Sequence, residues 1–481
     1  MLTHALVGLD ARRVEVEAHV ELTAPAFTIV GLADRACAEA KHRVRSGVMS
    51  AELQWPSAKI TVNLAPAALP KEGPGFDLPI ALAVLAASRQ VPTERLAAHA
   101  AVGELALDGR VRPVGGVLAV AEAARRAGAA RLLCAAESAA EASLAGIEPV
   151  PVRHLAEAAA YLRGDAEPSP YELPENGHEP AFPDLADVRG QERARRALEL
   201  AAAGSHNLLL AGPPGTGKTM LARRLPGILP RLDPEEALEV TRIHSVSGLL
   251  SREQPLVRHP PFRAPHHSAS MAALVGGGRA ARPGEVSLAH RGVLLLDELP
   301  EFQRQALEAL RQPIEDGVVS VARAEGRAVY PARFQLIATM NLCPCGARGD
   351  PAQECSCSTQ RLASYRERLS RALLDRFDLV VTVPRPRATE LAADRSEASA
   401  AVAKRIAAAR RRIAASVPRR TPEADELLSR AVERLPLSGR GRARVAHVAR
   451  SAAALAGSDA VQPEHVAEAL GYRSPRELEA T

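Results

Sequence analysis

The first third of the chain alternates short runs of β-branched and apolar residues with alanine-rich stretches. The runs have the composition of strands, and the alanine-rich stretches have the apolar spacing of helices. Strands are predicted at 27–30 and 59–64, helices at 78–88 and 117–127, and a hairpin turn at Asp108-Gly109. This pattern indicates an α+β or α/β domain over residues 1–165.

A proline-rich stretch then interrupts the periodic pattern. Residues 167–183 contain five prolines together with Asn176 and Gly177, without apolar residues at helix or strand spacing. Such a composition is typical of a stiff, solvated linker. We therefore place a domain boundary in a linker at residues 166–183.

Continuous apolar runs mark the second domain, residues 184–385. A helix is predicted at 192–203, followed by strands at 208–211, 293–296, 333–341 and 379–383. Beyond this domain, residues 386–481 are alanine-rich, with prolines between successive helical stretches. The predicted fold is an α/β core between the N-terminal domain and a C-terminal helical lid.

A glycine-rich loop joins the run at 208–211 to a helix that begins near Met220. Strand, glycine loop and helix in this order are typical of a P-loop, which binds the phosphates of a nucleotide. In that reading Lys218 contacts the β- and γ-phosphates and the Thr219 hydroxyl ligates Mg²⁺. A chance glycine-rich turn is the weak alternative. The loop residues are Gly212, Pro213, Pro214, Gly215, Thr216, Gly217, Lys218 and Thr219.

Two later strands end in polar residues suited to hydrolysis. The run at 293–296 is followed by Asp297, which can hold Mg²⁺ through water, and by Glu298, which can polarise the attacking water. Asn341 ends the predicted strand at 333–341 and is suited to positioning that water. A turn-forming role is the alternative for Asn341.

Three arginines are candidates for contacting phosphate from other parts of the fold. Arg376 precedes the strand at 379–383 and is a candidate arginine finger for the nucleotide of a neighbouring subunit. An ion pair with Asp375 or Asp378 within the chain is the alternative. Arg440 and Arg444, in the helical lid, are candidates for a second γ-phosphate sensor.

Composition adds little to this assignment. The 481 residues carry a formal net charge of +5, which permits a nucleic-acid partner without indicating one. The sequence has neither an apolar run long enough to cross a bilayer nor a secretory leader, so we expect a cytoplasmic protein without membrane contact.

Four of the six cysteines lie close together in the sequence. They form two Cys-x-Cys pairs, Cys343 with Cys345 and Cys355 with Cys357. Four thiolates in one loop can form a tetrahedral Zn²⁺ site, although pairs with two intervening residues are the commoner spacing. Reduced free thiols or redox-labile pairs are the alternative.

The order of these motifs resembles an AAA+ ATPase. Three further stretches, 261–268, 284–290 and 340–346, resemble the magnesium-chelatase-like AAA+ family, specifically its competence-protein branch. The resemblance implies ATP and Mg²⁺ as ligands and a ring-shaped homo-oligomer, a hexamer.

The N-terminal domain resembles the proteolytic domain of Lon-type proteases at 73–82 and 107–118. The positions that match the family's serine nucleophile and lysine base are Gly75 and Leu118. Neither side chain can perform that chemistry. The resemblance therefore implies the Lon fold without protease activity.

Residues 318–331 read as a hairpin between the Asp-Glu strand and the asparagine strand. It resembles the pre-sensor hairpin of chelatase-like AAA+ proteins, which projects into a central pore. Arg323 and Arg327 flank its turn and could contact DNA phosphates, whereas a solvated hairpin is the alternative. The resemblance implies a DNA helicase that drives branch migration in natural transformation. The alternative is a magnesium-chelatase-type motor subunit that remodels a protein partner.

Overall fold

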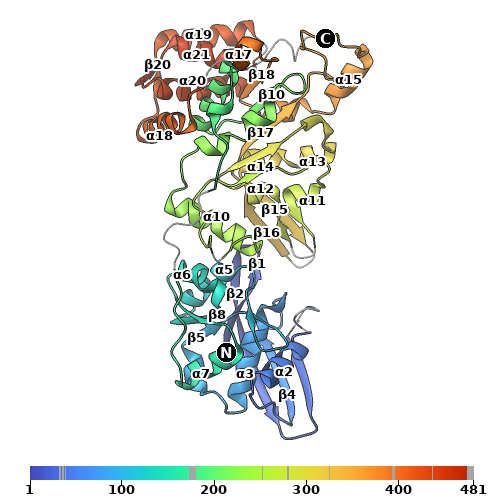
Figure 1. Ribbon diagram of the computed structural model, residues 1–481, viewed down its shortest axis with the longest axis vertical. Coiled ribbons are helices and arrows are strands. Elements are labelled where there is room, and N and C mark those ends of the chain that lie inside the picture. Colours follow the sequence, from blue (N-terminus) through green and yellow to red (C-terminus); the bar gives the residue numbers. More distant parts are fainter. Residues whose placement is uncertain are drawn as a thin grey trace.

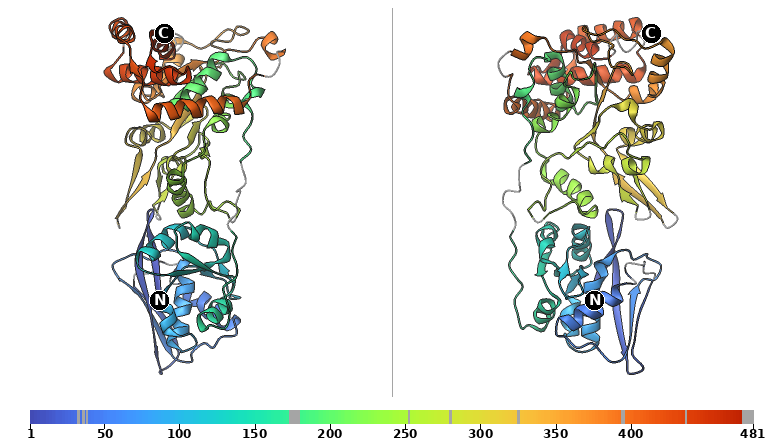
Figure 2. Two further views of the ribbon diagram at one scale, coloured as in Figure 1. Left: turned by 90° about the vertical axis from the view of Figure 1, so that its left-hand side faces the viewer. Right: turned by 45° about the vertical axis from the view of Figure 1, so that its right-hand side comes forward.

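The computed structural model shows two domains stacked end to end (Figures 1 and 2). It describes residues 1–31, 34, 37, 39–172, 180–251, 253–278, 281–323, 326–392, 396–435 and 437–473, with the side chains at 322, 323, 326 and 327 left out. Among the described residues, no helix is both long and apolar enough to cross a membrane.

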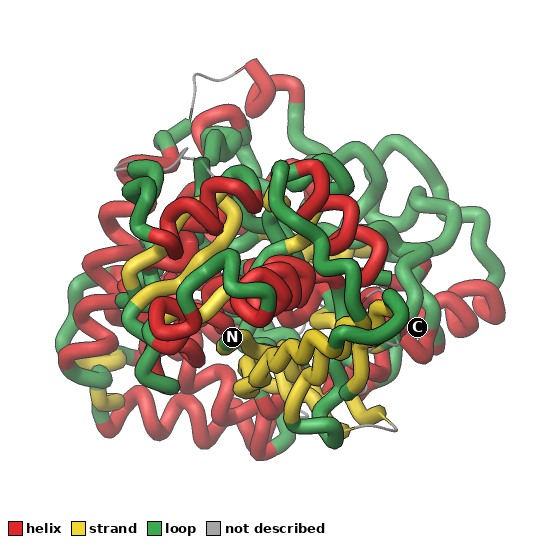
Figure 3. The backbone as a smooth tube through the Cα atoms, turned by 90° about the horizontal axis from the view of Figure 1, so that it is seen from below, coloured by secondary structure: helices red, strands yellow, loops and turns green. Residues whose placement is uncertain are grey.

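A seven-stranded sheet forms the N-terminal domain, in the order β3-β4-β2-β1-β5-β8-β9. Its strands are β1 (Leu2–Val7), β2 (Asp10–Glu21), β3 (Ala26–Val30), β4 (Lys59–Ala65), β5 (His99–Ala101), β8 (Arg131–Ala135) and β9 (Glu148–Val152). Figure 3 views the molecule from this end. The predicted strands at 27–30 and 59–64 are confirmed as β3 and β4.

Two hydrophobic cores enclose this sheet. The larger contains residues of α2 (Ala40–Ser50), α3 (Asp77–Ala87) and α7 (Leu155–Arg163), and the smaller contains residues of α5 (Val117–Arg126) and α6 (Ala139–Ser143). A short hairpin, β6 (Glu104–Leu105) and β7 (Val111–Arg112), turns through Asp108 and Gly109 as predicted.

The second domain contains a five-stranded sheet in the order β11-β14-β17-β10-β18. The strands are β10 (Leu208–Ala211), β11 (Phe262–Arg263), β14 (Val293–Leu296), β17 (Gln335–Met340) and β18 (Leu379–Thr382). Every pair of neighbours is parallel, so the carboxyl ends of all five strands lie at one edge. The predicted apolar runs at 208–211 and 293–296 are β10 and β14, and these two strands and β17 are buried on both faces.

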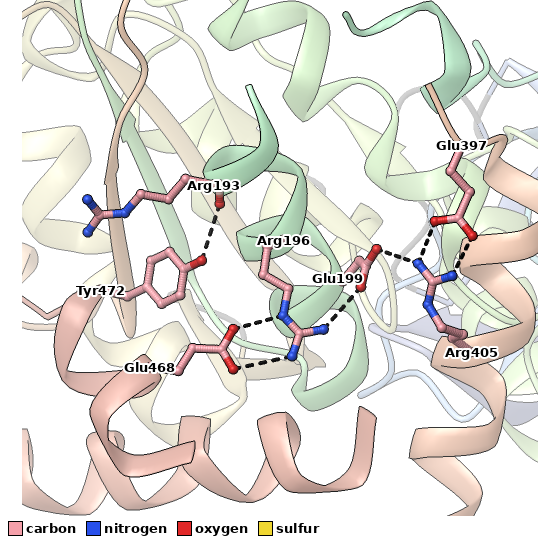
Figure 4. A network of polar contacts seen from close by, with 7 residues as sticks. All are labelled: Arg193, Arg196, Glu199, Glu397, Arg405, Glu468 and Tyr472. Carbon is pink, nitrogen blue, oxygen red and sulfur yellow. Dashed lines mark hydrogen bonds and ion pairs between the residues drawn. The ribbon is translucent and has the colours of Figure 1, made fainter. Parts of the chain in front are cut away.

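The C-terminal helices pack against the second domain through α8 (Glu192–Gly204) (Figure 1). They are α18 (Ser399–Ala415), α19 (Pro422–Arg434), α20 (Gly439–Leu455) and α21 (Pro463–Gly471). Arg196 of α8 bonds Glu468 of α21, and Glu199 of α8 bonds Arg405 of α18 (Figure 4). These ion pairs join α8 to α21 and α18, and the apolar cluster that they border also includes residues of the sheet.

The two domains meet where α5 contacts α10 (Pro234–Val246). Arg242 of α10 pairs with Glu122 of α5 at 2.6 Å, and the backbone N–H of Gly116 donates to the Ser245 carbonyl at 2.9 Å. The predicted hairpin at 318–331 is present as β15 (Val318–Arg323) and β16 (Gly326–Pro331). Leu9, in the turn between β1 and β2, packs against the apolar cluster to which this hairpin contributes.

Candidate functional site: a phosphate loop at the edge of a parallel sheet

The glycine loop follows β10 directly and ends in α9 (Lys218–Ala222). Gly215 and Gly217 have φ angles of +75° and +89°, which favour glycine. At Gly212 a Cβ atom would lie 2.3 Å from the Val383 carbonyl oxygen, so a side chain has no room there. The loop therefore needs these glycines for its shape.

The Lys218 ammonium group is folded back onto the loop. Its Nζ donates to the carbonyl oxygens of Gly212 at 2.8 Å and Pro213 at 2.7 Å, and to Asn341 Oδ1 at 3.1 Å. Burial lowers the pKa of Lys218 to about 8, although Asp297 and Glu298 oppose this shift. A bound anion would replace the carbonyl partners and favour the charged amine, so these residues fit a phosphate group.

Thr219 and Asp297 meet at the same edge of the sheet. The Thr219 hydroxyl lies 2.9 Å and 3.1 Å from the two carboxylate oxygens of Asp297. Hydroxyl and carboxylate oxygens are the ligand types that Mg²⁺ prefers. The pair therefore fits a magnesium ion, which would neutralise phosphate charge.

Thr339 is a site residue that the sequence prediction missed. Its hydroxyl donates to Asp297 Oδ1 at 2.5 Å and accepts from the Glu298 backbone N–H at 3.0 Å. Its position on the asparagine strand, two residues before Asn341, was the available signal. Thr339 thus joins the two strands that carry the carboxylates and the amide.

Glu298 lies directly after the strand end in a left-handed conformation, with φ of +55°. His267 Nδ1 is 3.9 Å from Glu298 Oε2, and its ring packs on His266 with the centroids 4.0 Å apart. His266 in turn bonds Ser268. The adjacent histidines therefore take part in packing and loop contacts.

A cavity of about 550 Å³ opens beside the glycine loop. Residues from four separate segments line it, among them Gln191, Pro213, Leu342, Gly349 and Val383. The cavity adjoins Gly212 and Pro213 of the glycine loop, an arrangement suited to the base and sugar of a nucleotide.

The arginine predicted as a finger is buried. Arg376 is 4% exposed, and its guanidinium bonds Glu315 and the Ala372 carbonyl oxygen. The alternative partners proposed for it, Asp375 and Asp378, were wrong. Those carboxylates pair with Arg444 at 3.2 Å and 3.3 Å.

Arg440 and Arg444, the predicted sensor arginines in α20, lie far from the glycine loop of their own chain. Asp378, the partner of Arg444, donates its N–H to Asn207, which precedes β10, whereas Gly212 follows β10. Arg440 is largely exposed and pairs with Glu315 at 3.3 Å. Arg376, Arg440 and Arg444 therefore gather at the amino edge of the sheet, opposite the loop.

The remaining predicted residues fall into three groups. The four cysteine sulfurs converge, all within 4.8 Å of one another. The side chains of Arg323 and Arg327, and the turn residue Glu325, lie outside the described residues. In the N-terminal domain Leu118 is fully buried, and a Cβ on Gly75 would contact Val102 and Val114.

The N-terminal domain, the second domain and the C-terminal helices each match a model of a known protein family. Three family models match: subunit ChlI of magnesium chelatase at residues 16–138, magnesium chelatase subunit ChlI at 184–391, and its C-terminal part at 396–473.

Relatives match at different lengths. YifB of Salmonella typhimurium is 43% identical over 494 residues, covering 98% of this chain and 96% of that protein. Competence protein ComM of Haemophilus influenzae is 43% identical over 497 residues, with the same coverage. The magnesium-chelatase 38 kDa subunit of Cereibacter sphaeroides is 29% identical over 227 residues, covering 44% of this chain and 60% of the subunit.

Proposed function

Because this chain belongs to the magnesium-chelatase-like family that includes competence protein ComM and YifB, we propose that it is an ATP-hydrolysing AAA+ motor that acts on DNA. The observation that carries the proposal is the convergence of the glycine loop, the Asp-Glu pair and Asn341 at one edge of a parallel sheet. Ligands of open α/β sheets bind at this edge.

Each residue has a role in this proposal. Loop amides and Lys218 hold the phosphates, while Thr219 and Asp297 hold Mg²⁺, whose charge would stabilise the transferring phosphoryl group. Glu298 orients and polarises the attacking water. The Asn341 amide, which contacts Lys218, positions the γ-phosphate and that water.

We propose a homo-oligomeric ring, a hexamer, as the active form. Arg376 and the lid arginines lie opposite the loop of their own chain. Any phosphate that these three arginines contact therefore belongs to a neighbour, which would complete each site. Formation of this interface would have to release Arg376 from Glu315.

DNA is the proposed substrate of the motor. The hairpin formed by β15 and β16 would carry Arg323 and Arg327 toward DNA in a central pore, where arginines bind phosphates irrespective of sequence. The task we propose is branch migration of DNA joints in natural transformation. We propose a structural Zn²⁺ in the cysteine cluster as a further cofactor.

A chelatase-type motor, which remodels a protein partner for metal insertion, is the second candidate. The family models carry the chelatase name, which favours it. The match to the 38 kDa chelatase subunit, however, covers 44% of this chain, whereas the ComM match covers 98%. Co-purification of a large porphyrin-binding subunit would favour the chelatase function.

The test is ATP turnover by the assembled protein without DNA and with single-stranded, duplex and three-stranded DNA. We expect saturating DNA to raise turnover, and three-stranded substrates to be converted to products. The double variant Arg323→Ala/Arg327→Ala should retain basal turnover and lose the stimulation. If none of these DNAs changes ATP turnover by an assembled ring, the proposed action on DNA is contradicted. The proposed ATPase activity is not affected by that result.

A further inference from the structure

The cysteine loop brings four sulfurs from two separate sequence pairs into one cluster. The Sγ atoms of Cys343 and Cys345 are 3.3 Å apart, and those of Cys345 and Cys355 are 3.6 Å apart. In a tetrahedral zinc–thiolate site, with Zn–S bonds of about 2.3 Å, neighbouring sulfurs lie about 3.8 Å apart. The separations in the cluster are close to this value.

A backbone N–H group also faces the cluster. The N–H of Arg348 donates to Cys343 Sγ at 3.3 Å. A disulfide joins sulfurs two at a time and does not require all four to meet, whereas a metal ion does.

The same loop packs on the nucleotide loop. Gly346 and Gly349 both have φ angles above +80°. A Cβ on Gly346 would lie 3.0 Å from Pro214, whereas one on Gly349 would lie 2.9 Å from Leu342 and 4.0 Å from Pro213. Glycine at position 346 therefore allows the cysteine loop to approach Pro214 of the glycine loop.

Two further contacts tie the cysteine loop to the site. Asn341 precedes Cys343 by two residues, and its carbonyl oxygen accepts from the Tyr365 hydroxyl at 3.2 Å. On the other side, buried Asp350 pairs with Arg385, just after β18, at 3.1 Å. The cysteine loop thus begins after β17, the strand that presents Asn341, and it contacts Arg385 just after β18.

We propose that Cys343, Cys345, Cys355 and Cys357 bind one Zn²⁺, and that this ion braces the nucleotide loop and Asn341. The bracing rests on the proposed nucleotide function, whereas the metal site does not. Without the ion, residues 343–357 have little apolar packing to hold them, since most of this segment is solvent-accessible. Pro213, Pro214 and Asn341 would then lose a rigid neighbour.

The metal site is tested by elemental analysis of the full-length protein purified under reducing conditions without chelator. We expect one zinc per chain, lost in Cys355→Ser/Cys357→Ser and retained in the control Ser356→Ala, which leaves every thiol in place. The Cys357→His variant supplies another zinc ligand and should retain the metal. A wild-type protein without zinc, with four titratable thiols or two disulfides, would overturn the proposal.

The bracing is tested by amide hydrogen exchange, which does not depend on catalysis. In Cys355→Ser/Cys357→Ser we expect faster exchange at 212–219 and around Asn341, with β8 in the N-terminal domain unchanged. Affinity for a fluorescent ATP analogue should fall roughly ten-fold, and Cys357→His should restore both. Zinc loss with unchanged exchange and affinity would overturn the bracing. Wild-type protein that holds zinc but does not bind the analogue would instead contradict the proposed function.

Discussion

The hydroxyl of Ser245, in α10 of the second domain, donates a hydrogen bond to the carboxylate of Glu141 in α6 of the N-terminal domain. The same carboxylate oxygen accepts from the Leu118 backbone N–H at 2.8 Å. Glu141 is buried at this contact between domains, and burial raises its pKa, although the two hydrogen bonds oppose the shift. An ionised Glu141 therefore disfavours the docked arrangement at neutral pH.

We expect Glu141→Gln to stabilise the docked protein at pH 7, because the amide keeps an oxygen acceptor and carries no charge. A raised pKa in the folded state means that stability falls as pH rises from the ordinary glutamate value through the raised one. The gain from Glu141→Gln should therefore shrink as pH falls toward that ordinary value. Calorimetry at pH values from the ordinary glutamate pKa up to pH 7 measures the difference in stability between Glu141→Gln and the wild-type protein. Ser245→Ala removes the hydrogen bond to Glu141 and serves as a control with the opposite effect. It should lower the free energy of unfolding by about 1 kcal/mol.

The contact between Ser245 and Glu141 shows what the sequence could not predict. Local apolar runs predicted β3, β4, β10, β14, β17 and β18, and the glycine-rich stretch at 212–219 predicted a loop between a strand and a helix, because both signals are local. Contacts between residues distant in sequence, such as Arg376 with Glu315, have no local signal. Thr339 does lie on a predicted strand, two residues before Asn341, but its bond to Asp297 depends on the pairing of β17 with β14, which local sequence does not specify.

Lys218 and Glu298 should separate nucleotide binding from hydrolysis. Lys218→Ala removes the phosphate contact, and we expect it to abolish both ATP binding and turnover. Glu298→Gln keeps the shape of the side chain and removes its charge, so ATP should bind and turnover should fall by about 10²-fold or more. Equilibrium binding of ATP and steady-state turnover measure the difference. Equal loss of binding in both variants would contradict the assigned roles.

Arg376 gives a test of shared sites, since its guanidinium is buried against Glu315 in the single chain. If Arg376 is an arginine finger, the Arg376→Ala variant should lower turnover by about 10³-fold while ATP still binds. Mixing Arg376→Ala protein with Lys218→Ala protein should restore part of the turnover. Some interfaces then combine an intact loop from one subunit with an intact arginine from the other.

The matched control for Arg376 is Glu315→Gln. If the pair serves only to stabilise the chain, both variants should lower the melting temperature and turnover together, and mixing should restore nothing. If Arg376 acts on a neighbour's nucleotide, Glu315→Gln should keep most of the turnover. Size-exclusion chromatography with light scattering confirms that the variants still assemble.

The N-terminal domain contains a buried ion pair whose loss should unfold it selectively. Asp77 is fully buried at the start of α3, and its carboxylate bonds Arg43 at 2.6 Å and 3.0 Å and the Leu105 N–H at 3.1 Å. Arg43→Met would leave that charge buried with only the Leu105 hydrogen bond, at a cost of about 3–5 kcal/mol. The double variant Arg43→Met/Asp77→Asn removes the charge and should recover much of this loss. Calorimetry should show the change in the N-terminal transition while ATP binding persists, and an unchanged transition in Arg43→Met would contradict the assigned pair.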